Sequence, residues 1–243
     1  MAVSLFAVCL ITAFSFWATR QSGADVRGAL SAPLRAGVKL DMFSTGISTA
    51  VDVTPSPDAQ WLIRAAAQTG IPARALRAYV AAAATANVSA PTCGIGWNTV
   101  AAVGSVESAH GTYGGGSLDT AGQASGPILG PSLNGAGFAA IADTDAGALD
   151  GDARWDHAVG PMQFIPSTWQ LVGQDGNGDG TADPFNIDDA ALSAATYLCA
   201  RGRDLTTAQG WTDAIYSYNQ SDPYIRQVRA QATAYAAKTG TAE

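Results

Sequence analysis

The sequence predicts a mainly α-helical domain. Apolar residues recur at helical spacing in several segments from residue 58 onward. No convincing run of alternating apolar and polar residues, the pattern of a half-buried strand, is found in the chain. With 243 residues and a hydrophobic content of 47%, the chain is long enough to bury one sizeable core. We therefore expect one helical domain with additional segments around it.

The first 24 residues are expected to be a signal peptide, cleaved after Ala24, or an uncleaved membrane anchor. Their apolar run of about 17 residues is intermediate between a signal-peptide core and a membrane span. No Lys or Arg precedes this run, whereas Arg20 follows it, which conflicts with export under the positive-inside rule. We therefore expect a true start further upstream. Residues 25–57 contain several Gly and Pro and predict a flexible linker.

The first two predicted helices form a pair. Asp58 is a candidate N-cap for a helix that carries Trp61. Pro72 can open a second helix, because proline is tolerated in a first turn, and this helix carries Leu76 and Tyr79 at adjacent turns of one face.

A third helix is predicted over residues 96–109. Val100, Val103, Gly104 and Glu107 follow the i, i+3, i+4, i+7 pattern and therefore share one face, which Glu107 ends. Apolar surroundings penalise the charged form of a carboxylate, which suits a general acid that works near neutral pH. The alternative is a glutamate at the edge of the apolar face that points to water.

Later helices are predicted after Pro166 and over residues 189–199, 211–217 and 222–238. The stretch 112–156 is rich in Gly, Ala, Ser and Asp and is long for an unstructured connection inside a domain. It is interpreted either as one wall of a substrate groove or as a disposable surface insertion.

Three segments together carry a resemblance to a known family: Glu107-Ser108 with Gly111, then GPMQF at 160–164, then Tyr218-Asn219. In order and separation they resemble the signature of the lytic transglycosylases of the lysozyme-like superfamily. The resemblance covers roughly residues 59–235, only loosely over 112–156. It implies a lysozyme-like helical domain of the goose-type or soluble lytic transglycosylase-like form over residues 58–243. It also implies an enzyme that acts on peptidoglycan at the bacterial cell envelope, secreted or membrane-anchored.

The resemblance further implies a mechanism with a single carboxylate. Ordinary glycoside hydrolysis needs a second carboxylate about 5–9 Å from the acid. The available candidates, Asp143, Asp145 and Asp156, lie in no recognisable catalytic context. Lytic transglycosylases instead use one glutamate, here Glu107, first as acid and then as base, and the 6-hydroxyl of the muramic acid closes a 1,6-anhydro ring. The alternatives are a hydrolytic muramidase and a non-catalytic, calcium-stabilised cell-wall binding or scaffolding module.

Five residues are candidates for substrate contacts on the same resemblance: Ser108, Gln163, Phe164, Tyr218 and Asn219. Ser108 can bond substrate or backbone, and the amide of Gln163 can bond sugar hydroxyls. Tyr218 and Asn219 match the Tyr-Asn pair that the family places in the groove near the acid. The alternative for Tyr218 is core packing, with Tyr216 exposed instead.

Residues 175–198 resemble the calcium-loop-plus-helix insertion of the membrane-bound lytic transglycosylase B type. The segment reproduces positions 1, 3, 5, 6 and 7 of an EF-hand-like loop, but position 12 is Asn186 and not the bidentate Glu. The resemblance supplies a later aspartate, aligned with Asp189, and Asp188 is its close rival. The predicted ligands of a structural Ca²⁺ are Asp175, Asn177, Asp179, Thr181 and Asp189. The alternative is a metal-free Asx-rich turn; no organic cofactor is expected.

Cys93 and Cys199 are expected to form a disulfide, because two cysteines in an exported domain usually pair, and the alternative is two buried free thiols. The formal net charge is −7 and 14% of residues are charged, so no basic stripe is available for nucleic acid. The expected partners are peptidoglycan glycan strands and, if the N-terminal segment is uncleaved, the membrane. Cell-wall synthesis or division proteins are possible partners that the sequence does not identify.

Overall fold

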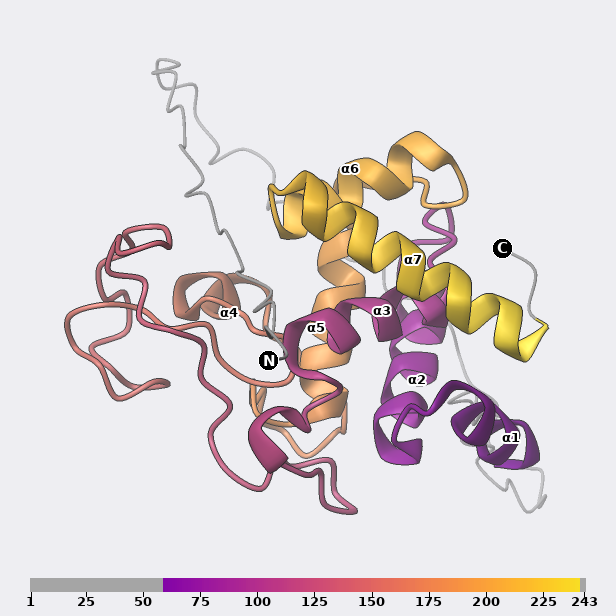
Figure 1. The fold of residues 1–243 in the computed structure, drawn as a ribbon, viewed down its shortest axis with the longest axis horizontal. Helices are drawn as coiled ribbons and strands as arrows, with labels where there is room; N and C mark the ends of the chain where they lie inside the picture. The colour runs from indigo at the N-terminus through magenta and orange to yellow at the C-terminus, as the bar shows by residue number, and fades with distance from the viewer. Residues whose placement is uncertain (1–58, 241–243) are drawn as a thin grey trace, which may run out of the picture. The chain divides into compact units, whose positions relative to one another are not determined.

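The structure is a computed structural model that describes residues 59–240. The predicted signal peptide or anchor (1–24), the linker (25–57) and the Asp58 cap lie outside the described residues. Within them the fold is mainly helical, as predicted (Figure 1), and contains only isolated β-bridges in place of strands. The α-helices of this part are α1 (Ala59–Thr69), α2 (Ala73–Ser89), α3 (Trp97–Ser108), α4 (Pro166–Val172), α5 (Ile187–Cys199), α6 (Ala208–Tyr218) and α7 (Asp222–Thr239).

The predicted helices are present, and their starts are set by capping residues. α5 begins at Ile187, not at the predicted residue 189, because the side chain of Asn186 accepts a hydrogen bond from the second backbone N–H of the helix. α6 begins at Ala208 for the same reason, since the Thr207 hydroxyl accepts from Gly210 N at 3.1 Å.

The core forms where α2 packs on α5 and α3, and where α3 packs on α7. Leu76 and Tyr79 of α2 and Val103 of α3 are fully buried there. α2 and α3 approach closely at Gly104, where a Cβ atom would overlap the Tyr79 hydroxyl. Gly104 therefore allows α2 and α3 to pack closely near the end of α3.

The predicted disulfide is confirmed. Cys93 and Cys199 are bonded, with their Cα atoms 5.4 Å apart, and join residues separated by 106 positions in the chain. Both cysteines are buried. The bond fixes the segment before α3 to the end of α5, so it constrains a large part of the unfolded chain.

The long segment 112–156 contains a 3₁₀ turn, Tyr113–Gly115, and no α-helix. Figure 1 shows it as a loop-rich region beside the helices. It is packed nonetheless, because Leu133 is buried in a small apolar cluster with Ala158 and Ile165, against which Phe138 and Ile141 pack. The segment is therefore an integral part of the domain.

Among residues 59–240, no helix has both the length and the apolar character needed to cross a membrane.

His110 links three helices inside the core. Its Nδ1 lies 3.2 Å from the Tyr79 hydroxyl and its Nε2 lies 3.0 Å from the Tyr235 hydroxyl. Gln231 donates to the same Tyr235 oxygen at 3.0 Å and to Ser105 Oγ at 3.3 Å. Burial lowers the pKa of His110 from 6.5 to about 4, since the charged imidazolium is poorly solvated there. His110 is therefore neutral in the folded protein above that pH.

The pKa of His110 predicts an acid-sensitive stability. As pH falls below 6.5, the unfolded chain takes up the histidine proton first, so folding free energy is lost down to about pH 4. The full loss is roughly 3 kcal/mol at about 1.4 kcal/mol per pKa unit. His110→Asn, which tolerates the positive φ of this position, should flatten that loss in urea unfolding between pH 4 and 6.5. His157→Asn is the control and should keep it, and an unchanged slope in His110→Asn would contradict the prediction.

Candidate active site

Glu107 lies in the last turn of α3, half-buried at the end of the face formed by Val100, Val103 and Gly104, as predicted. Its Oε1 accepts a hydrogen bond of 2.5 Å from the hydroxyl of Tyr224. Tyr224 belongs to the first turn of α7 and is 6% exposed. The carboxylate oxygen is therefore held by a donor from a helix that packs directly on α3.

Ser108 joins the end of α3 to the GPMQF segment. Its hydroxyl donates to the Pro161 carbonyl oxygen at 2.6 Å and accepts from Gly111 N at 2.7 Å. Ser108 is buried, so these backbone contacts account for its hydroxyl. Of its two predicted roles, the structure shows backbone bonding.

The GPMQF segment forms a tight turn. Gly160 has φ +76°, and a Cβ atom there would overlap the carbonyl oxygen of Pro184, so glycine is required. Gln163 also has a positive φ, and its amide nitrogen donates to the Gly160 carbonyl oxygen at 2.9 Å. The Gln163 side chain thus closes the turn, and its predicted contact with sugar stays a prediction.

Tyr218 reaches the same turn from the end of α6. Its hydroxyl donates to the Met162 carbonyl oxygen at 2.8 Å, and its ring meets Phe164 edge-on with centroids 5.9 Å apart. Tyr218 is half-buried, whereas Tyr216 is 46% exposed. Tyr216 is thus exposed, as in the core-packing alternative. Tyr218 is only partly buried and keeps an accessible surface beside the turn.

Phe164 and Asn219 are both buried, at 4% and 3% exposure. Phe164 packs between Tyr218 and Trp169, and Asn219 forms the C-cap of α6 with its N–H donating to Ile215 O. These two residues support the Tyr218 side of the site, and their predicted substrate contacts are untested.

The three motif segments therefore converge. Ser108 and Tyr218 each bind a backbone carbonyl of the 160–164 turn, and Tyr224 binds Glu107. The sequence analysis did not identify Tyr224. The available signal was its place in the first turn of a helix that begins with a Ser-Asp-Pro cap, five residues after the second member of the Tyr-Asn pair.

The acidic loop 175–189 is organised around carboxylates that bind backbone N–H groups. Asp175 accepts from Gly178, Asp179 and Gly180, and Asp179 accepts from Thr181. Asn177 Oδ1 accepts from the N–H of Asp179 at 2.8 Å. These are the hydrogen bonds of Asx turns, which the metal-free alternative to a calcium loop predicts.

Asp189 and Asp188 are clearly distinguished. Asp189 is fully buried and accepts from Gly176 N, Asn177 N and Asp183 N, so it lies against the loop. Asp188 instead pairs with Arg74 through both carboxylate oxygens. Burial raises the pKa of Asp189, although its backbone donors oppose this shift. An oxygen-rich loop that closes on a buried carboxylate suits a hard divalent cation such as Ca²⁺.

A second acidic group lies in the 143–156 region. One carboxylate oxygen each from Asp143, Asp145 and Asp156 lies within 4.8 Å of the others. Asp143 and Asp145 accept backbone N–H groups of their own loop. Asp156 is fully buried and accepts from Thr144 N at 2.9 Å and Thr144 Oγ1 at 2.7 Å. These carboxylates therefore hold the loop together.

Comparison with known families supports the functional assignment in outline. Residues 138–212 match the family model described as Transglycosylase SLT domain. This match supports the lytic transglycosylase family and a peptidoglycan-cleaving enzyme, and it implies an extracytoplasmic location. It includes the 160–164 turn and the acidic loop but neither Glu107 nor Tyr218. No curated protein and no solved structure gives a significant match to the chain.

Proposed function

We propose that this protein is a peptidoglycan lytic transglycosylase of the membrane-bound B type that cleaves the β-1,4 bond between N-acetylmuramic acid and N-acetylglucosamine. The observation that carries the proposal is the Glu107 carboxyl group, half-buried and bonded to Tyr224. It stands at the end of a helix that Ser108 ties to the family-matched turn.

In the proposed mechanism Glu107 acts twice. Its carboxyl proton passes to the glycosidic oxygen as the C1–O bond breaks, which releases the leaving sugar. The carboxylate then takes the proton of the muramic acid 6-hydroxyl, whose oxygen bonds to C1 and closes the 1,6-anhydro ring. The Tyr224 O–H stabilises negative charge on Oε1 between these steps.

The surroundings of the other acids favour this scheme over hydrolysis. A muramidase needs a second carboxylate that is available to act as nucleophile or base. Asp143, Asp145 and Asp156 instead satisfy backbone and hydroxyl donors of their own loop. Their positions support a structural role, so a single-carboxylate mechanism is the better fit.

The first test is the product chemistry of the full chain. Purified peptidoglycan is incubated with wild type and with Glu107→Gln, and the soluble products are analysed by mass spectrometry. We expect anhydromuropeptides from wild type and a loss of roughly a thousandfold in Glu107→Gln, because the general acid is removed. Reducing-end products would instead indicate the muramidase, and binding without any release would indicate the scaffolding module.

The second test concerns Tyr224. Tyr224→Phe keeps the ring and removes one hydrogen bond to a carboxylate, so we expect kcat to fall roughly ten- to a hundredfold. Tyr216→Phe, which alters an exposed hydroxyl on α6, is the matched control. Equal kcat values for Tyr224→Phe and wild type would show that the hydroxyl does not assist Glu107.

Calcium is the second part of the proposal. Asp175, Asn177, Asp179 and Asp189 would supply side-chain oxygens and Thr181 a backbone carbonyl. The cation would hold the loop whose Pro184 carbonyl oxygen lies against Gly160, and so would support the turn without taking part in proton transfer. When bound, it contributes charge neutralisation to the buried Asp189.

The calcium site predicts a ligand-dependent stability. At a hundredfold excess over Kd, a cation that binds only the folded state stabilises by about 2.7 kcal/mol, or roughly 5–10 °C in Tm for a domain of this size. Calorimetry with CaCl₂ and with EDTA should show this shift in wild type and in Asp143→Asn, but a much smaller one in Asp179→Asn. A shift lost only in Asp143→Asn would instead place the cation in the 143–156 cluster.

A further inference from the structure

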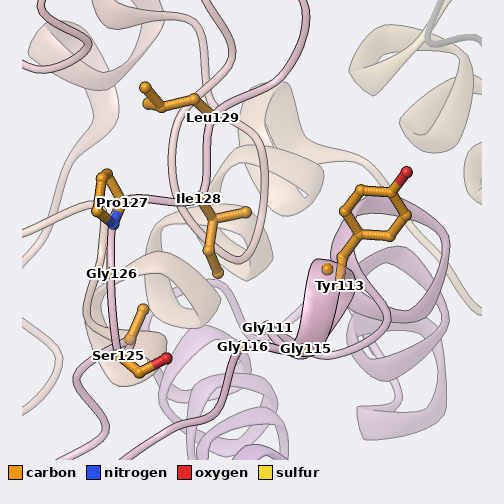
Figure 2. A pocket seen from close by; sticks show the side chains of 11 residues that line it. Gly111, Tyr113, Gly115, Gly116, Ser125, Gly126, Pro127, Ile128 and Leu129 are labelled. Atoms are coloured by element: carbon orange, nitrogen blue, oxygen red, sulfur yellow. The ribbon is translucent and has the colours of Figure 1, made fainter.

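A cleft of about 370 Å³ opens beside the end of α3. Figure 2 shows the ring of Tyr113 on one side and Pro127, Ile128 and Leu129 on the other, with glycine backbone at the base. The cleft lies outside the part of the chain that matches the transglycosylase family. Its volume falls in the lower part of the range of about 300–1,000 Å³ that is typical of small-molecule sites.

The lining has a distinctive chemistry. It contains no charged residue, and five of its eleven residues are glycines. Tyr113 is 64% exposed, so its ring is available to a ligand. Backbone amide groups and the Ser125 hydroxyl supply neutral hydrogen-bonding groups. An aromatic platform beside neutral donors and acceptors suits an uncharged ring that is apolar on one face and polar at its edge, as an N-acetylhexosamine is.

The walls of the cleft are anchored to the rest of the domain. Ile128 O accepts from Gly160 N at 2.8 Å, and Ala124 N donates to Phe185 O at 3.1 Å. On the other side, Thr112 N donates to Ser108 O at 3.1 Å, directly before Tyr113. The cleft is therefore preformed, which limits the ordering cost of binding a ligand.

The lining of the cleft is hydrogen-bonded to the end of the helix that contains the proposed catalytic residue. Gly111 lines the cleft and is bonded through its N–H to the hydroxyl of Ser108, the residue next to Glu107. A glycan strand with its scissile bond at Glu107 has further sugar units on either side of that bond. The neighbouring cleft can accommodate one of them.

We propose that this cleft is a saccharide subsite in which an N-acetylhexosamine unit of the glycan strand stacks on Tyr113. The proposal rests on the function proposed for Glu107 and deepens it by naming a specificity-determining residue. The stem peptide is a poorer occupant, because its carboxylates and amines would find no counter-charge in the lining.

The first experiment measures binding in the catalytically disabled full chain, Glu107→Gln. Isothermal titration with a neutral N-acetylglucosamine oligomer gives the parent affinity. Adding Tyr113→Ala should weaken binding roughly five- to tenfold, because ring stacking is lost, whereas Tyr113→Phe should keep most of it. The control is Tyr216→Ala, which should leave affinity unchanged. Tyr216 is exposed and lies two positions before Tyr218, so its ring is on the opposite face of α6.

A second variant adds a large side chain to the lining of the cleft without straining the fold. Gly126 lines the cleft, lacks a positive φ, and a Cβ atom there would meet nothing within 4 Å. Gly126→Leu should therefore fold normally and still weaken binding of the oligomer. Ala237→Leu on the exposed surface of α7 is the matched control, and thermal unfolding of both variants verifies the fold.

The outcomes separate the subsite from the proposed function. Parent-like affinity in both Tyr113→Ala and Gly126→Leu would overturn the subsite, even if wild type released anhydromuropeptides. Weaker oligomer binding in both variants supports the subsite, even if wild type released no product, in which case only the catalytic proposal would fail. If the variants lost affinity for a soluble stem peptide and not for the oligomer, the cleft would be a peptide site and the proposal wrong.

Discussion

The hydroxyl of Ser108 is the contact on which the arrangement of the site depends. In a buried position it connects the end of α3, the turn that follows it and the Pro161 carbonyl oxygen. The turn needs such support, because Ala109, His110 and Gly111 all have positive φ, which is unfavourable for the first two. The bond to Gly111 N and the burial of His110 between two tyrosines offset that cost. Without the hydroxyl, a buried N–H and a buried C=O would lose their partner.

The abrupt end of α3 has two consequences for function. It leaves Glu107 in the last helical turn, where α7 can place Tyr224 against the carboxylate. It also turns the chain directly into the glycine-rich segment that starts the Tyr113 cleft. The end of α3 therefore fixes the proposed acid and one side of the proposed subsite, and residues 124–129 of the long loop supply the other side.

The sequence predicted the helices and the disulfide, because periodicity, caps and cysteine chemistry are local or pairwise signals. That the motif segments meet was implied by the family resemblance alone. The sequence could not predict Tyr224, since its contact with Glu107 arises from the packing of α3 on α7. It favoured Asp189 over Asp188 only through the resemblance, because neighbouring positions of a helix differ in direction by about 100° and the pairing of Asp188 with Arg74 arises from the packing of separate helices. The sequence identified Gln163 as part of the site but not its contact with the Gly160 carbonyl, because a side-chain amide can bond a backbone turn as well as a sugar.

The distribution of the acidic residues fits the proposed single-carboxylate mechanism in a chain of net charge −7. Around the site, backbone N–H groups of the loops that no strand or helix satisfies donate instead to aspartates: Asp143, Asp145, Asp175, Asp183 and, from α5, Asp189. Buried or constrained loops need such acceptors, since unsatisfied N–H groups are costly. These aspartates therefore stabilise the loops that border the site. Glu107, by contrast, lies within α3, whose own hydrogen bonds satisfy the backbone there. Its carboxyl group is held by the Tyr224 hydroxyl.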